Sequence, residues 1–168
     1  MNKIKNKDGF ISVVAIILGA TLFISFLWLT LDLSYYVQQN RSTKNILDNA
    51  SSSAVTRVDE STLGSGDIKF LRNEVEEMAM SIIRNDLFLD ENNNPLPQSP
   101  LREKPEIQVL VVDNVDREYG TRVDVAGVKN MRVKNPSVII YAKLPIKGLF
   151  LQGIGPTFQH ISASQVSY

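Results

Sequence analysis

The one histidine of the chain, His160, is the residue best suited to acid–base catalysis. It lies in the segment HISAS, whose β-branched and small residues are typical of a strand. A catalytic imidazole needs a partner that orients it and holds its pKa near neutrality. The neighbouring sequence offers no such partner, so we interpret His160 as a structural or surface residue.

One arrangement would still give an anchored hydrolase. A sheet that brought a carboxylate to His160 in a cleft would form an acid–base pair. The carboxylates in question are Asp113, Asp116, Glu118 and Asp124. The chain has no cysteine and contains no GxSxG, HExxH, phosphate-binding glycine or dinucleotide-binding motif. We therefore expect no enzyme, no catalytic residue and no cofactor.

The run DENNN, which begins at Asp90, is the closest approach to a metal-binding motif. Its oxygen-bearing side chains alternate as they do in a calcium-binding loop. However, Pro95 stands where such a loop needs glycine, and Leu101 stands where it needs the closing glutamate. We predict a solvated turn and no metal site.

The charge balance limits the partners that the surface can attract. The 168 residues carry 18 Lys and Arg against 18 Asp and Glu, which gives a formal net charge of zero. Nucleic-acid binding needs a surplus of basic residues, so we expect no nucleic-acid partner. The length fits one compact domain with an appendage.

The apolar residues gather near the N-terminus. No charged residue occurs between Asp8 and Asp32, and residues 10–31 are dominated by Ile, Leu, Val and Phe. A helix of about 23 residues, at about 1.5 Å per residue, exceeds the roughly 30 Å hydrocarbon thickness of a bilayer. We predict a transmembrane helix at residues 10–31, with the lipid bilayer as its partner.

The flanking charges predict the orientation of this helix. Lysines precede it at positions 3, 5 and 7, whereas Asp32 follows it at once. Under the positive-inside rule, residues 1–9 form a basic cytoplasmic leader and the rest of the chain lies outside the cytoplasm. A cleavable secretory signal is the rival interpretation. It is disfavoured because the apolar run is long and ends in LDLSYYVQQN, without a small-residue cleavage site.

The helix is expected to continue beyond the membrane as a stalk over residues 32–60. Glycine and proline are absent from position 21 to position 63, so no residue obliges the helix to end at the membrane surface. Apolar and small side chains recur there at three- and four-residue spacings and form one stripe. They are Ile46, Leu47, Ala50, Ala54, Val55 and Val58. The serines at 51–53 lower the helix propensity near the end that we expect, at about Val58.

Residues 61–168 are predicted to form an extracytoplasmic α+β domain. After a turn at 61–66, Ser65 or Asp67 is a candidate cap for an amphipathic helix that runs to about Leu87. The apolar positions of that helix are Ile68, Leu71, Val75, Met78, Ile82 and Leu89. A proline-rich loop and four segments rich in β-branched and aromatic residues follow, which predict a small antiparallel sheet of about four strands. The loop lies at 90–105 and the strands lie at 107–112, 122–128, 138–144 and 158–166.

The connection at 145–156, PIKGLFLQGIGP, is unusual because apolar residues interrupt a glycine-rich loop. They are Leu149, Phe150, Leu151 and Ile154. One interpretation is that these side chains fold over the sheet edge or the helix. The other is that they form a contact surface for a membrane or a neighbouring subunit.

The N-terminal pattern resembles that of a known family. A basic leader ending in Lys7-Asp8-Gly9, then Phe10 and an apolar helix with an amphipathic continuation, resembles the class III signal and stalk of type IV pilins. The likeness is closest to the TadE/TadG-like pseudopilins of tight-adherence pilus systems and covers residues 1–58. It implies that a prepilin peptidase cuts after Gly9 and leaves a new amine on Phe10. It also implies that the helix packs against other subunits after assembly.

The sequence departs from the pilin pattern at the fifth position after the leader. Pilins carry glutamate there, whereas this chain has Val14. An unpaired charge among packed apolar helices is costly, so a subunit without that glutamate suits a minor, terminal or permanently membrane-held role. Gly19 and Ala20 are small enough to let a neighbouring helix approach closely.

These patterns together predict a non-enzymatic minor pilin-like or pilus-assembly subunit of the bacterial inner membrane. Its N-terminus would lie in the cytoplasm and its C-terminal domain outside. The alternative is a single-pass, membrane-tethered binding or sensory module unrelated to pili. A cytoplasmic tail that ends at about Asp8 is too short to fold or signal by itself, which weighs against that alternative.

Overall fold

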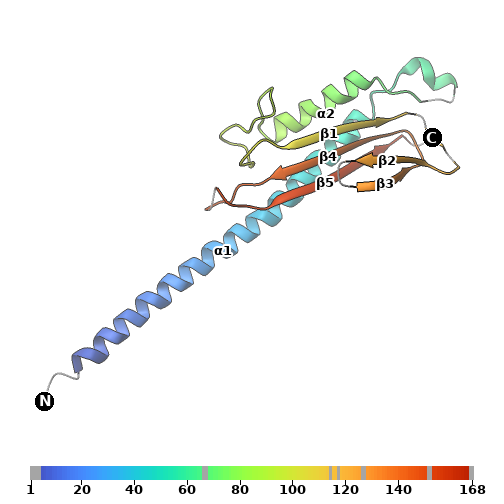
Figure 1. The fold of residues 1–168 in the computed structure, drawn as a ribbon. Helices are drawn as coiled ribbons and strands as arrows, with labels where there is room; N and C mark the ends of the chain where they lie inside the picture. The colour runs from blue at the N-terminus through green and yellow to red at the C-terminus, as the bar shows by residue number, and fades with distance from the viewer. Residues whose placement is uncertain are drawn as a thin grey trace.

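A computed structural model of the chain shows a long helix that carries a folded head at its C-terminal half. The structure describes residues 5–65, 68–113, 115–116, 118–125, 128–150 and 153–166. The helix, α1 (Lys5–Ala54), runs for 50 residues without a break. Its N-terminal half extends away from the head, and its C-terminal half lies under a sheet (Figure 1).

Helix α1 differs from the predicted helix at both ends. It begins at Lys5 rather than at Phe10, since the leader contains no residue that stops a helix short of the span. It ends at Ala54 rather than near Val58, because Val58 instead forms a β-bridge with Phe70. Ser51, near this end, is buried against β5, so tertiary contacts offset its low helix propensity.

The described residues form five strands in two antiparallel sheets, so the predicted α+β class is confirmed with one strand more than expected. The larger sheet has the order β1-β4-β5, and β2 and β3 form a separate hairpin. The strands are β1 (Glu106–Val112), β2 (Thr121–Val125), β3 (Val128–Val133), β4 (Ser137–Pro145) and β5 (Thr157–Gln165). The sequence prediction missed β3 because its segment, VKNMRV, mixes basic and amide side chains with apolar ones and lacks a continuous β-branched run.

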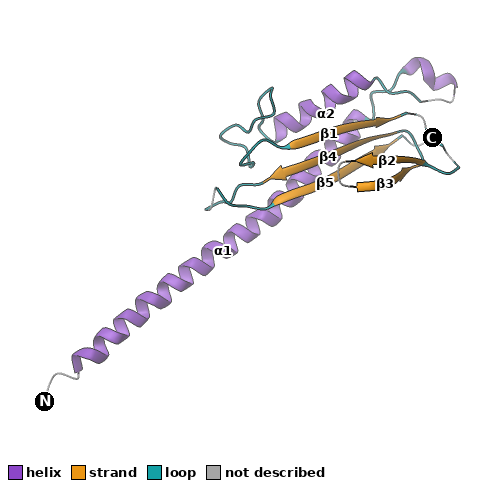
Figure 2. Ribbon diagram, viewed as in Figure 1, coloured by secondary structure: helices purple, strands orange, loops and turns teal. Residues whose placement is uncertain are grey.

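The head has three layers (Figure 2). Helices α1 and α2 cover one face of the larger sheet, and the β2–β3 hairpin covers the other. Strand β4 lies in the centre, with Val138, Ile140 and Leu144 toward the helices and Ile139 and Tyr141 toward the hairpin. Both faces of β4 are therefore buried, which explains why its sequence is almost wholly apolar.

Helix α2 (Arg72–Asp86) buries a face slightly different from the predicted one. The fully buried residues are Val75, Ala79 and Ile83, whereas Met78 and Ile82 are only partly buried. The prediction was correct at Val75. At Met78 and Ile82 it was wrong by one residue, because it favoured large apolar side chains. Where α2 packs against α1, the buried position is occupied by Ala79, whose small side chain lets the two helices lie close together.

The start of α2 is also set by tertiary contacts rather than by a local cap. The N-cap position is Leu71, which makes no side-chain cap hydrogen bond. Of the two predicted caps, Ser65 ends a short 3-10 helix, η1 (Glu60–Ser65), and Asp67 lies outside the described residues. Instead, the Arg72 guanidinium binds Asp113, at the end of β1, through Nε at 3.1 Å and Nη2 at 2.8 Å. The helix start is thereby fixed to the sheet.

Helix α1 meets β5 through small polar side chains. The Ser51 hydroxyl lies 2.8 Å from that of Ser162 and 2.9 Å from that of Ser164. Ser162 in turn donates a hydrogen bond of 2.7 Å to the Asp48 carboxylate. Small side chains let the helix lie close to the strand, and their mutual hydrogen bonds satisfy polar atoms that have lost contact with water.

His160 belongs to the same interface. Its Nε2 lies 3.2 Å from the Thr43 hydroxyl, which itself donates to the Gln39 carbonyl at 2.8 Å. The Thr43 oxygen is then left as the acceptor, which favours the tautomer with hydrogen on Nε2. Burial lowers the pKa of His160, and the positive charge of Lys44 lowers it further, whereas the negative charge of Asp48 partly opposes the shift.

The depressed pKa predicts that acid weakens the α1–β5 interface. The folded protein binds the imidazole proton less readily than the unfolded chain does, so stability is complete above the ordinary pKa of 6.5 and falls as the pH drops below it. Between about pH 7.5 and 5.5, the Tm of the detergent-solubilised chain should fall more for the wild type than for His160→Gln. Equal decreases in Tm for the two proteins would contradict this assignment.

Candidate functional site

The N-terminal half of α1 presents an apolar surface that the head does not cover. Side chains in residues 10–31 are exposed around the whole helix, as in Phe10 and Leu22, each 71% exposed. In the described part of the chain, α1 is the one helix long and apolar enough to cross a membrane. Its hydroxyls are satisfied within the helix, for example Thr21 by the Ile17 carbonyl at 2.9 Å.

Burial of α1 begins abruptly at Asp32, the first charged residue after the apolar segment. Asp32 is only 4% exposed. One of its carboxylate oxygens accepts the backbone N–H groups of Leu149 at 2.8 Å and Phe150 at 3.1 Å. Both donors lie in the β4–β5 connection, residues 146–156, which we name the junction loop. Two charge-assisted hydrogen bonds compensate a carboxylate that has lost its water.

Aromatic residues one turn before and one turn after Asp32 also contact the junction loop. The ring of Trp28 stacks on that of Phe150, with centroids 5.8 Å apart and an interplanar angle of 15°. The Tyr36 hydroxyl donates to the Ile154 carbonyl at 3.1 Å. The junction loop therefore lies along α1 at the boundary between its bare and its covered halves (Figure 1).

The sequence analysis did not predict the role of Asp32. It treated this residue only as the charge that ends the membrane span. The available signal was its spacing. Trp28, Asp32 and Tyr36 recur every four residues and therefore share one helix face. That same face continues into the buried residues Thr43 and Leu47. A polar residue between two aromatic residues on the packing face indicates a specific contact.

The base of the junction loop is held by several hydrogen bonds. The N–H of Ile146 donates to the Pro156 carbonyl at 3.0 Å, which closes the loop. Arg102 reaches in from the preceding proline-rich segment and donates from Nη1 to the Gly155 carbonyl at 2.8 Å. A Cβ at Gly155 would collide with the Ile146 carbonyl, so this close approach requires glycine. These contacts fix the two ends of the loop, at Ile146 and at residues 155–156.

The two interpretations of the loop's apolar residues apply to different parts of it. The first interpretation, in which these side chains fold over the helix, fits Phe150, whose ring stacks on that of Trp28. The second requires exposed side chains: Leu149 is 49% exposed, Phe150 45% and Ile154 68%. Leu151 lies outside the described residues.

The other residues singled out in the sequence lie on the bare part of α1. Gly9 and Phe10 are exposed within the helix, so the leader from Lys5 onward is continuous with the apolar segment. Gly19 and Ala20 are also exposed, and a Cβ placed on Gly19 would meet no atom within 4 Å. The surface around Gly19 is therefore open to another helix.

The described structure does not show the acid–base arrangement considered for a hydrolase. Asp113 pairs with Arg72, and Asp116 accepts the backbone N–H of Glu118 at 3.0 Å in the turn before β2. His160 faces α1 instead. The two other carboxylates considered, those of Glu118 and Asp124, belong to exposed residues.

The Asp90 segment forms a turn that uses its own oxygens. Asp90 Oδ1 accepts the backbone N–H groups of Asn92 at 2.8 Å and Asn94 at 2.7 Å, and Oδ2 accepts the Asn94 side-chain amide at 3.0 Å. The hydrogen bonds from Asn94 are the main cause of a lowered pKa at Asp90. Within the described ranges, no three His, Cys, Asp or Glu residues gather as metal ligands would.

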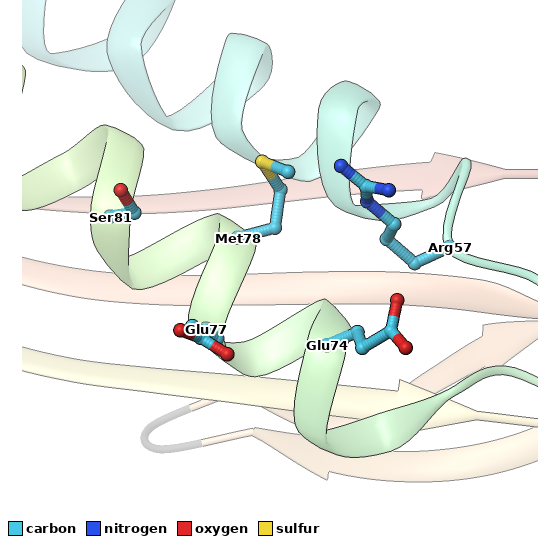
Figure 3. A pocket seen from close by; sticks show the side chains of 5 residues that line it. All are labelled: Arg57, Glu74, Glu77, Met78 and Ser81. Atoms are coloured by element: carbon cyan, nitrogen blue, oxygen red, sulfur yellow. The ribbon is translucent and has the colours of Figure 1, made fainter.

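A surface hollow of about 370 Å³ lies between the end of α1 and α2. Figure 3 shows Arg57 and Glu74 directed into it, with Met78 at its side. The charged side chains that line it are exposed to solvent. Solvated charges along a groove between two helices do not indicate a binding site.

The contacts of Asp32 predict how the junction loop responds when its acceptor is removed. In Asp32→Ala, the amides of Leu149 and Phe150 should exchange hydrogen roughly 10- to 100-fold faster, because each loses a bond to a charged acceptor. Asp32→Asn keeps an acceptor oxygen and should retain most of the protection. Hydrogen exchange of the full chain in micelles measures both. Unchanged exchange in Asp32→Ala would show that the carboxylate does not hold the loop.

Comparison with known proteins identifies no relative, so the function has to be argued from the geometry described above. No protein-family model, curated protein or solved structure matches the chain. The features that any proposal must explain are the bare apolar half of α1, the head packed on its other half, and the junction loop at the boundary between them.

Proposed function

We propose that this chain is a non-enzymatic, single-pass subunit of a pilin-like assembly in the bacterial cell envelope. The observation that carries the proposal is the division of α1 between two environments. Residues 10–31 are apolar and bare, whereas the second half of the same helix supplies Leu47, Ala50 and Ala54 to the core of the head. A helix of this kind can be held by lipid before assembly and by neighbouring helices afterwards.

The orientation follows from the charges at the two ends of the apolar segment. The lysines of the leader favour the cytoplasmic side, and Asp32 with the head favours the opposite side. The head would then lie outside the cytoplasm, attached to the inner membrane through a helix that does not bend where it leaves the bilayer. It would be displayed at a fixed distance from the membrane surface.

The absence of a carboxylate from the apolar segment supports a minor or assembly role rather than that of a major filament subunit. The apolar segment contains none, and Val14 stands where pilins have glutamate. Asp32, the nearest acidic residue beyond it, is engaged by the junction loop. In this part of the chain no carboxylate is therefore placed to pair with the N-terminal amine of a neighbouring subunit among packed helices.

The leader is suited to removal by a prepilin peptidase. Gly9 is the residue before the expected cut, and it lies within α1. Glycine costs about 1 kcal/mol relative to alanine in a helix interior, so Gly9 weakens the helix at the expected cut. Cleavage would leave Phe10 as the first residue of the apolar segment. Further along the same segment, Gly19 and Ala20 provide a place for a neighbouring helix to pack.

The intact mass of the protein, purified from membranes of cells that contain an active prepilin peptidase, tests the proposal. We expect the mass of a chain that lacks residues 1–9. Gly9→Leu should keep the full-length mass, because the cut that the resemblance implies follows glycine. Gly19→Leu is the matched control: it makes the same change at the other glycine of the apolar half and should still be cleaved.

A full-length wild-type chain in those membranes would contradict the pilin-like proposal and favour the tethered binding module. Cleavage at an unrelated position, or equal cleavage of Gly9→Leu, would contradict it as well. The comparison between the two glycine variants separates loss of processing from loss of membrane insertion, since both variants keep an apolar helix of the same length.

A further inference from the structure

We propose that the junction loop is a second membrane contact, whose exposed apolar side chains enter the interfacial layer of the bilayer that holds α1. This inference rests on the proposed membrane anchoring. The side chains are those of Leu149, Phe150 and Ile154. The occupant of this apolar surface would be lipid, and the loop would fix the tilt and rotation of the head relative to the membrane.

The depth of the loop follows from its contact with Trp28. Trp28 lies in the last turn of the apolar segment, one turn before Asp32, and its ring stacks on that of Phe150. Tryptophan near the end of a membrane span lies at the headgroup level. Phe150 stacks on that ring and must lie at a similar depth. The exposed surface of the loop is therefore continuous with the lipid-facing surface of α1.

The charges of the loop suit the same position. Residues 146–156 contain no acidic side chain, and their one charge is Lys147. Lys147 Nζ donates to the Pro97 carbonyl at 3.1 Å, and Arg102 donates to Gly155 at the base of the loop. Apolar side chains at the tip with cations behind them form the usual pattern of a segment that binds at a membrane interface.

Asp32 makes this placement physically acceptable. Backbone N–H groups that enter the interface without a partner are costly. The N–H groups of Leu149 and Phe150 have such a partner in the Asp32 carboxylate. Conversely, the carboxylate is kept from water by the loop that it binds. The loop and α1 would therefore meet the membrane as one unit, and Asp32 acts as a positioning residue.

A neighbouring subunit is the main competitor for this surface. Lipid is favoured because the junction loop lies at the end of the head from which the apolar half of α1 emerges (Figure 1), and because Phe150 stacks on Trp28 of that half. Any subunit docked there would have to share the bilayer with α1. The experiment must therefore separate contact with lipid from contact with a second chain.

The absence of cysteine makes the test direct, since one introduced cysteine carries the only label. The full chain is placed at one copy per nanodisc of phosphatidylcholine and phosphatidylglycerol. A nitroxide is attached in Ile154→Cys, in Phe23→Cys within the apolar segment, or in Tyr119→Cys, whose site on the head is 67% exposed. Collision rates with oxygen, which dissolves in lipid, and with a water-soluble nickel chelate are then measured.

We expect the oxygen-to-nickel ratio at position 154 to lie between that at 23 and that at 119. In the Asp32→Ala background the ratio at position 154 should fall to the value at position 119.

The inference would be overturned, with the anchoring intact, by a ratio at position 154 equal to that at position 119 while position 23 lies in lipid. A water-like ratio at 23 would overturn the anchoring itself. A raised ratio at 154 only in discs that hold several chains would assign the surface to a subunit contact. These outcomes are compared among the three labelled sites in the chain that keeps Asp32, so the test holds even if Asp32→Ala fails to fold.

Discussion

The structure depends on one helix that has two different surroundings along its length. From Asp32 onward one face of α1 is packed by the head, whereas residues 10–31 are apolar and exposed. Because the helix is continuous, the position of the head on α1 also determines where the uncovered apolar surface begins. The abrupt change at Asp32 is produced by the junction loop, which covers the carboxylate and then leaves its own apolar side chains open.

The attachment of the head to α1 uses two kinds of contact. Apolar residues such as Leu47 and Ala50 face α2 and the sheet, and they provide most of the burial. Toward β5 the contact is polar, with Ser51 against Ser162 and Thr43 against His160. Small polar residues that hydrogen-bond to one another allow β5 to lie close to α1. They also select one position of β5 along α1, because sliding the strand by one residue would bury unpaired polar groups. The head is thereby held in a single position along the helix.

The sequence was sufficient for features that depend on local patterns. The apolar span, the continuation into a stalk and the α+β class follow from composition and periodicity, and the structure agrees with the class. Features that depend on distant partners were missed. Strand β3 forms through pairing with β2, the start of α2 is set by Asp113, and the role of Asp32 requires amides 117 and 118 positions away. No local pattern contains that information, although the spacing of Trp28, Asp32 and Tyr36 gave a partial signal.

The central claim is that α1 remains one straight helix from the lipid to the head. The most direct measurement is the distance between two nitroxides, attached in the double variant Ile16→Cys and Asn45→Cys, in the full chain in nanodiscs. The two positions are 29 residues apart, so a continuous helix predicts a narrow distribution centred at about 44 Å. A markedly shorter or broad distribution would show that the helix breaks where it leaves the membrane, and would contradict the account.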